Sequence, residues 1–176
     1  IDYCVDGSIV YHPNYPYKSG VTKELVEYQH EISESLMSKY NLKNDDLILD
    51  IGSNDGTLLT GFKKHGIKTL GVEPTNISKI ANQNGIETIQ EFFDVNLANK
   101  IKNTHGEASL ILSTNMFAHM ATIGEVISGI EILLKEDGVF VLESHYLLDV
   151  IKGGQFDTIY HEHLRTYSLK SLIKLF

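Results

Sequence analysis

The 176-residue sequence lacks the features that mark disulfide-rich, membrane-spanning or nucleic-acid-binding proteins. Its single cysteine, Cys4, excludes an internal disulfide framework and a cysteine-rich zinc site. Because no apolar run approaches ~18 residues and no signal-peptide pattern is present, we expect no membrane partner and a cytoplasmic location. A formal net charge of −8 with scattered lysines argues against a nucleic acid partner, which would call for a basic stripe.

The composition is that of one ordinary globular domain, with 42% hydrophobic and 22% charged residues. We expect strands at 47–51, 68–72, 87–90, 108–113 and 138–143, and helices at 21–40, 57–65, 77–84, 95–102 and 123–134. This alternation predicts an α/β fold with a Rossmann-like, doubly wound, mostly parallel sheet. Residues 1–20 are expected to form an N-terminal arm that lies as a loop across a domain of residues 21–176.

The most informative motif is the turn that follows the first apolar run, Leu47–Ile51. Gly52 and Gly56 remove side chains that would block a close approach to the backbone, and the next helix presents free N–H groups to an anion. The turn therefore predicts a nucleotide cofactor site. Dinucleotide-binding turns have a glycine where this sequence has Asn54, so a nicotinamide dinucleotide is only the runner-up.

Two acids at the ends of strands decide which cofactor is expected. Asp50 can reach an amino group, which suits the zwitterionic tail of S-adenosyl-L-methionine. Glu73 stands 23 residues later, at the end of the second expected strand, where a carboxylate can accept hydrogen bonds from both ribose hydroxyls. The pair predicts S-adenosyl-L-methionine as the cofactor, and a glycine-rich turn with no ligand is the alternative.

Further cofactor-binding candidates follow from the rule that ligands lie beyond the carboxyl ends of parallel strands. This rule gathers Asp50, Gly52, Glu73, Asp94, Asn115 and Glu143 on one rim, and the cofactor-binding candidates in this region are Asp50, Gly52, Ser53, Asn54, Gly56, Glu73, Pro74, Phe93, Asp94 and Asn115. Phe93 can cover an adenine face, and Asp94 can accept a hydrogen bond from the adenine amine. Core packing of the phenylalanine and N-capping of the next helix by Asp94 are equally good alternatives.

The segment from Gly153 to Ser168 gathers titratable side chains beyond the last expected strand. His163 is the candidate general base, because histidine changes charge near neutral pH and an adjacent carboxylate can stabilise its cation. No metal is expected, since His161, Glu162 and His163 are consecutive and cannot all face one centre in a helix or strand. On this segment alone, a polar loop whose histidines bond backbone carbonyls is an equal alternative.

Five stretches of the sequence resemble one known family. They are residues 15–22, 50–59, 71–75, 115–120 and 155–163. They resemble the S-adenosylmethionine-dependent C-methyltransferases that act on nucleotide-linked keto-deoxysugars, and the resemblance spans nearly the whole chain. The Tyr-His-Glu-His block at 160–163, with the Phe-Asp-Thr-Ile that precedes it, is the most restricted of these motifs.

The resemblance implies a class I methyltransferase fold, a small-molecule nucleotide-sugar substrate and four catalytic residues. His163 is similar in position to the base that removes a proton alpha to the sugar ketone, which gives an enolate that takes the methyl group. Tyr160 and Glu162 match residues that bond the sugar or tune the base. His119 matches a histidine that also faces the reaction centre.

The resemblance also concerns the arm and parts that this sequence lacks. Tyr17 and Ser19 match an N-terminal motif that folds over the cofactor. Relatives have a zinc module before this region and a second α/β half after it, so we expect a piece of a longer protein, with the sheet truncated before its last two strands. His145 stands where relatives are expected to have an apolar residue such as proline, so substrate preference is expected to differ. Methyl transfer to oxygen or nitrogen of another acceptor, and a cofactor-binding module without turnover, remain alternatives.

Overall fold

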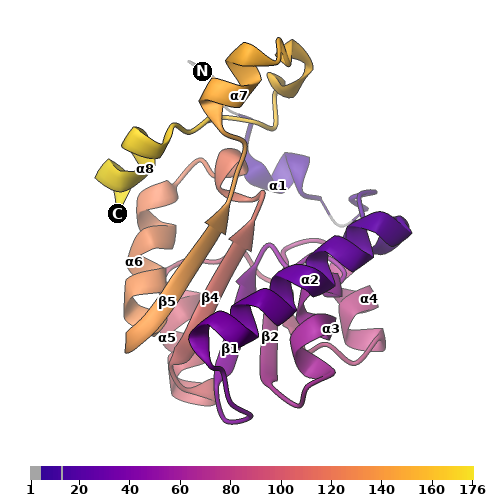
Figure 1. The fold of residues 1–176 in the computed structure, drawn as a ribbon, viewed down its shortest axis with the longest axis vertical. Coiled ribbons are helices and arrows are strands. Elements are labelled where there is room, and N and C mark those ends of the chain that lie inside the picture. Colours follow the sequence, from indigo (N-terminus) through magenta and orange to yellow (C-terminus); the bar gives the residue numbers. More distant parts are fainter. Residues whose placement is uncertain (1–4, 13) are drawn as a thin grey trace.

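The computed structural model describes residues 5–12 and 14–176, so Cys4 and Pro13 lie outside the described residues. One sheet runs through the middle of the molecule, with helices on both faces (Figure 1). The strands are β1 (Leu47–Ile51), β2 (Lys68–Val72), β3 (Thr88–Ile89), β4 (Ala108–Thr114) and β5 (Leu134–Glu143). All pairings are parallel, in the order β3-β2-β1-β4-β5. The predicted Rossmann-like α/β fold is confirmed.

Each helix expected between strands is present, with ends that differ by a few residues. The helices are α1 (Gly7–Val10), α2 (Lys23–Tyr40), α3 (Thr57–Lys63), α4 (Ile77–Gln83), α5 (Val95–His105), α6 (Ile123–Leu133), α7 (Leu147–Lys152) and α8 (Leu169–Leu175). The long helix α2 begins at Thr22, whose hydroxyl accepts the N–H of Leu25 at 3.3 Å. It ends at Asn41, which adopts the left-handed conformation that terminates many helices.

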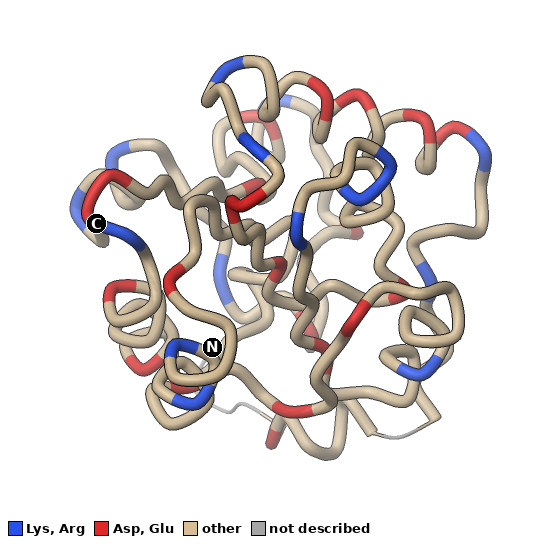
Figure 2. The backbone as a smooth tube through the Cα atoms, turned by 90° about the horizontal axis from the view of Figure 1, so that it is seen from below, with Lys and Arg blue, Asp and Glu red and all other residues tan. Residues whose placement is uncertain are grey.

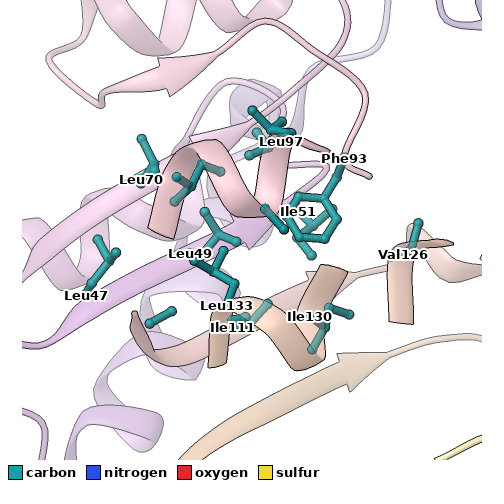
Figure 3. Close-up of a cluster of buried hydrophobic side chains, with 14 of the residues drawn as sticks. Leu47, Leu49, Ile51, Leu70, Phe93, Leu97, Ile111, Val126, Ile130 and Leu133 are labelled. Carbon is teal, nitrogen blue, oxygen red and sulfur yellow. The ribbon is translucent and has the colours of Figure 1, made fainter. Parts of the chain in front are cut away.

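Side chains of β1 alternate between two apolar cores, one on each face of the sheet. Leu47, Leu49 and Ile51 pack with α5 and α6 in the cluster of Figure 3, whereas Ile48 packs with α2 and α3 on the other face. A strand buried on both faces explains the continuous apolar run in the sequence. Because β1 is packed from both sides, the polar residues at its carboxyl end have fixed positions.

The expected start of β5 at Gly138 is wrong. Leu134 already pairs with Ala108, the chain then loops out, and regular pairing resumes between Val139 and Leu110. A Cβ at Gly138 would lie 3.0 Å from the carbonyl oxygen of Ala108, so a glycine permits this close return. Among the described residues β5 pairs only with β4, which leaves its other edge open.

The arm was expected to be a loop throughout, and the structure differs from this expectation at two short segments. Gly7–Val10 forms one helical turn, capped by the carboxylate of Asp6, which accepts the N–H of Ser8 at 2.8 Å. A 3-10 turn at Ser19–Val21 then leads directly into α2.

Basic and acidic residues are scattered over the backbone, and the basic ones do not gather into one stripe in this view (Figure 2). In the described part of the chain, no helix combines the length and apolar character that crossing a membrane requires.

Candidate active site

A cavity of about 1230 Å³ opens at the carboxyl ends of the strands. Its walls come from the turns after β1, β2 and β4, from the arm, and from the segment after α7. The predicted site residues that line it are Tyr17, Ser19, Asp50, Gly52, Ser53, Asn54, Glu73, Pro74, Phe93, Asp94, Asn115, His119, Tyr160, Glu162 and His163. One cavity therefore contains both the predicted cofactor residues and the predicted catalytic residues.

The two glycines of the turn after β1 have different surroundings. Gly52 has a φ of +80°, and a Cβ there would lie 2.7 Å from Cγ of Met116, a cavity residue that the sequence analysis did not assign to the site. Gly56 has a φ of +78°, and its Cβ position lies 3.0 Å from Ile86, in the core behind the turn. Gly56 does not line the cavity, so it shapes the turn through packing.

Glu73 ties the turns after β1 and β2 together. Its Oε2 accepts the N–H of Asn54 at 3.1 Å, and its Oε1 accepts the N–H of Thr75 at 2.9 Å. The side chain is buried below the cavity. Each carboxylate oxygen has a second lone pair, so Glu73 can still accept hydrogen bonds from a ligand hydroxyl.

Asp50 is a buried carboxylate that needs a partner. It is 2% exposed, and its Oδ1 has no hydrogen-bond partner among the described residues. Burial, and secondly the charge of Glu73, raise the pKa of Asp50 well above its ordinary value. An orphaned acid beside the cavity fits the ammonium group of S-adenosyl-L-methionine, which would supply both a hydrogen bond and a compensating charge.

Replacing Asp50 with asparagine should stabilise the cofactor-free protein at neutral pH. Its pKa is about 3.9 in the unfolded state and higher in the folded state, so stability is lost as pH rises through the folded-state pKa. Asp50→Asn removes this loss. We expect the free energy of unfolding to increase by about 1–3 kcal/mol near pH 7.5, and to be unchanged near pH 3.5, in urea titrations.

Asp46, directly before β1, provides a matched control of opposite sign. Burial alone would raise its pKa, but hydrogen bonds from Ser109, the N–H of Lys43 and Lys135 lower it overall. Its contribution is therefore present at neutral pH and lost as pH falls, so Asp46→Asn should destabilise the protein at pH 7.5. A stability difference for Asp50→Asn that did not vary with pH would contradict the buried-charge explanation.

Asn54 and Asp55 hold the arm against the cofactor turn. The amide of Asn54 accepts the N–H of Ser19 at 2.8 Å and donates to the carbonyl of Tyr17 at 3.1 Å. Oδ2 of Asp55 accepts the N–H of Gly20 at 2.8 Å. Tyr17 and Ser19 thus border the cavity through backbone contacts to the turn. The role of Asp55 was missed, because an acid in a turn carries no signal of a partner 35 residues away.

Phe93 and Asp94 adopt the alternatives that the sequence left open. Phe93 is 7% exposed and packs on Gly129 of α6, whereas Phe92 is 51% exposed. Oδ1 of Asp94 accepts the N–H of Leu97 at 2.8 Å and so caps α5. Both residues also line the cavity, and their adenine contacts stay a prediction.

Asn115 at the end of β4 has a left-handed φ of +55° and connects to the end of β5. Its Nδ2 donates to Oε1 of Glu143 at 2.5 Å, and Oε2 of Glu143 accepts the hydroxyl of Tyr28 at 2.8 Å. Tyr28 lies on α2 and was not predicted to belong to the site. This chain of polar groups closes the cavity on the side of α2.

His163 lies at the centre of a cluster of aromatic rings in the wall of the cavity. Its ring centroid is 4.4 Å from that of Tyr160, 4.8 Å from that of His119 and 4.9 Å from that of His145. The structure therefore brings together three of the predicted catalytic residues from the block and from the loop after β4. Glu162 faces the arm, where its Oε2 accepts the hydroxyl of Tyr15 at 3.3 Å.

The hydrogen bonds of His163 identify its basic atom. Nδ1 lies 2.8 Å from the carbonyl oxygen of Thr158, and because a carbonyl can only accept, Nδ1 carries the hydrogen. The lone pair of the neutral ring is then at Nε2, 3.3 Å from the hydroxyl of Tyr160. Burial, and secondly the charge of Glu162, raise the pKa of Tyr160, so this hydroxyl keeps its proton and donates.

His119 is a neutral neighbour of this base. Burial, and secondly the charge of His163, lower the pKa of His119, so its ring is uncharged near neutral pH. Its Nδ1 is buried without a partner among the described residues. The ring of Tyr11, from the arm, meets it edge-on at 5.9 Å. Neither Tyr11 nor Tyr15 was among the site residues predicted from the sequence.

Main-chain contacts hold the base block to the loop after β4. The N–H groups of Leu164 and Arg165 donate to the carbonyl of Ala118 at 2.8 and 3.2 Å. The guanidinium of Arg165 donates to the carbonyls of Met120 and, at 3.1 Å, Ala121. These bonds fix the block next to the loop histidine. Within residues 5–12 and 14–176, no cluster of His, Cys, Asp or Glu side chains is arranged to hold a metal ion.

The sequence is similar to those of known methyltransferases. The profile of a family described as a methyltransferase domain matches residues 24–176. The chain belongs to this family. C-methyltransferase NovU of Streptomyces niveus is 35% identical to this methyltransferase domain over 164 residues, which are 93% of this chain and 39% of NovU. The chain thus spans less than half the length of that relative.

Solved structures share the fold of this methyltransferase domain. A SAM dependent methyltransferase from Archaeoglobus fulgidus is similar with a TM-score of 0.65 and 15% identity, over 83% of this chain and 66% of that one. The plantazolicin methyltransferase BpumL in complex with a monoazolic desmethylPZN analog and SAH is similar with a TM-score of 0.66 and 18% identity, over 87% of this chain and 63% of that one. S-adenosyl-L-methionine is the cofactor of this family, as predicted.

Proposed function

We propose that this domain methylates a carbon next to the ketone of a nucleotide-linked deoxysugar. The observation that carries the proposal is the position of His163, whose Nδ1 is fixed on Thr158 while the basic Nε2 lies in the same cavity as the cofactor acids. The 35% identity to a C-methyltransferase supports transfer to carbon. Oxygen or nitrogen acceptors need no residue that removes a proton from carbon.

In this reaction His163 removes the proton, and Tyr160 orients the imidazole of His163. Nε2 of His163 takes the proton alpha to the ketone, the electron pair of the broken C–H bond forms a C=C bond, and the π pair of the carbonyl moves to its oxygen, which gives an enolate. When bound, the cofactor supplies an electrophilic methyl group to the enolate carbon. Before the proton transfer, the Tyr160 hydroxyl orients the imidazole of His163 by donating to Nε2. As substrate takes this place, the hydroxyl hydrogen turns away, and the hydroxyl oxygen can accept the N–H that forms at Nε2. The bound proton leaves to solvent.

The charges of the cavity favour the sugar over the phosphates as the part that enters. Among the described residues that line it, none is Lys or Arg, whereas several are carboxylates. A diphosphate inside would therefore meet acids without a fixed cation. We expect the reacting sugar ring inside the cavity and the nucleotide diphosphate outside it.

Product analysis with labelled cofactor tests this function. Incubating the protein with methyl-labelled S-adenosyl-L-methionine and a panel of keto-deoxysugar nucleotides should give a sugar labelled on a carbon adjacent to the ketone. Label on oxygen or nitrogen, located by NMR, would contradict the proposal and favour the alternative acceptors. Calorimetric titration with S-adenosyl-L-methionine and with NAD separately checks cofactor choice, and tight NAD binding would contradict it.

A further inference from the structure

His145 is a cavity histidine without an assigned function. It follows the end of β5 by two residues, lines the cavity, and lies 4.9 Å from His163 between ring centroids. Neither of its ring nitrogens forms a hydrogen bond within the described chain. An imidazole in this position can donate to an oxygen atom of a molecule bound beside the base.

The other histidines of the cavity are committed to the protein. His163 donates from Nδ1 to the carbonyl of Thr158, and its Nε2 is the base beside the Tyr160 hydroxyl, so the neutral ring has no further N–H to donate to a substrate oxygen. His119 is largely buried, and His161 is directed toward the carboxylate of Glu162 at 3.8 Å. No Lys or Arg is among the described residues of the lining, so the donor to a substrate oxygen cannot be one of these cations. Of the cavity histidines, His145 is then the one best placed to donate.

The enolate supplies a group for this donor to bind. As His163 removes the alpha proton, the electron pair of the C–H bond forms the C=C bond, and the π pair of the C=O bond moves to the carbonyl oxygen, which becomes negative. When the carbon then takes the methyl group, the C=O bond re-forms and the oxygen loses its charge. A donor near this oxygen therefore binds more strongly in the transition state than in the ground state.

We propose that His145 binds the acceptor through a hydrogen bond from its imidazole N–H to the carbonyl oxygen of the sugar. The proposal deepens the function proposed above and rests on it. His145 acts on the oxygen while His163 acts on the neighbouring carbon, which is possible because the two rings are adjacent in the cavity, with centroids 4.9 Å apart. The residue then restricts the acceptor to sugars with the ketone on the side of His145.

Two substitutions of His145 test the hydrogen bond separately from ring packing. His145→Phe keeps a planar ring but has no donor, whereas His145→Asn keeps a donor. We expect His145→Phe to lower kcat by about 10²–10³-fold, the usual loss for one oxyanion donor, with a smaller change in KM. His145→Asn should recover part of the rate. Cofactor affinity, measured by calorimetry, should match wild type in both and so report correct folding.

Exchange of the alpha hydrogen with deuterated solvent, followed by NMR with SAH in place of the methyl donor, isolates the enolate step. His145→Phe should slow this exchange as much as it slows methyl transfer, while His65→Phe, at an exposed position after α3, should not change it. Wild-type exchange in His145→Phe would overturn the role of His145 and leave the proposed function standing. A wild-type protein that neither exchanges nor methylates any keto-sugar nucleotide would overturn both.

Discussion

Replacing His163 with alanine should reduce methyl transfer by about 10²–10⁴-fold, the usual contribution of a general base, and leave the affinity for S-adenosyl-L-methionine unchanged. The base acts through Nε2, and the ring is fixed by Thr158 and Tyr160. Burial lowers the pKa of His119, which makes its ring a weaker base, and its Nδ1 is buried without a partner among the described residues. The cofactor acids lie on the strand ends of the sheet, and no contact of Asp50 or Glu73 with His163 is observed.

Three measurements separate the outcomes for His163. Steady-state rates with labelled cofactor give the loss of turnover, calorimetry gives cofactor affinity, and His65→Ala, at an exposed position outside the cavity, provides the matched control. If His163→Ala retains near wild-type turnover with intact cofactor binding, His163 is not the base. If His163→Ala loses cofactor binding as well, the segment after α7 also holds the cofactor. The assignment of cofactor binding to the strand ends and of catalysis to this segment is then wrong.

The features recognised from sequence depend on short-range patterns. The apolar run of β1, the φ-positive Gly52 and the spacing of Asp50 and Glu73 all follow from local chain geometry and from the rule that parallel strands end on one rim. The fold was predictable for the same reason, because strands and helices alternate at regular intervals.

The features that sequence could not give depend on contacts between distant segments. Tyr15 meets Glu162 across 147 positions, and the contact of Arg165 with Met120 spans 45. Nothing in the composition of the arm indicates that its tyrosines reach the base block. Asp94 shows a different limit, since one acid served equally well as a helix cap or as an adenine acceptor, and the cap is the role that the structure displays.

The second large effect is expected at Glu73. In Glu73→Gln one of the two acceptor oxygens becomes an NH₂ group, so the N–H of Asn54 or of Thr75 loses its partner in a buried position. The charge that would bind ribose hydroxyls is lost as well. We expect the Kd for S-adenosyl-L-methionine to rise about 10- to 100-fold, and the free energy of unfolding to fall by about 1–3 kcal/mol. Calorimetry and urea unfolding measure the two effects.

Glu87→Gln is the matched control, because Glu87 is exposed and pairs only with His105 at the surface. Its stability change should stay within about 0.5 kcal/mol, and its cofactor affinity should equal that of wild type. An unchanged Kd in Glu73→Gln would contradict the assignment of Glu73 to the cofactor. A fall in stability would not rescue the assignment, because losing the hydrogen bond to the N–H of Asn54 or Thr75 is enough to lower stability.

Glu73 and Asp50 are coupled, and this coupling gives the sharpest form of the test. The charge of Glu73 is the second cause, after burial, of the raised pKa of Asp50. Glu73→Gln should therefore lower the pKa of Asp50 and reduce the free energy by which Asp50 destabilises the cofactor-free fold at neutral pH. Asp50→Asn should stabilise that fold and Glu73→Gln should destabilise it, yet both should weaken cofactor binding. If the two variants change the free energy of unfolding in opposite directions but both raise the Kd for the cofactor, the weaker binding cannot be a consequence of altered stability. The two carboxylates then bind the cofactor directly.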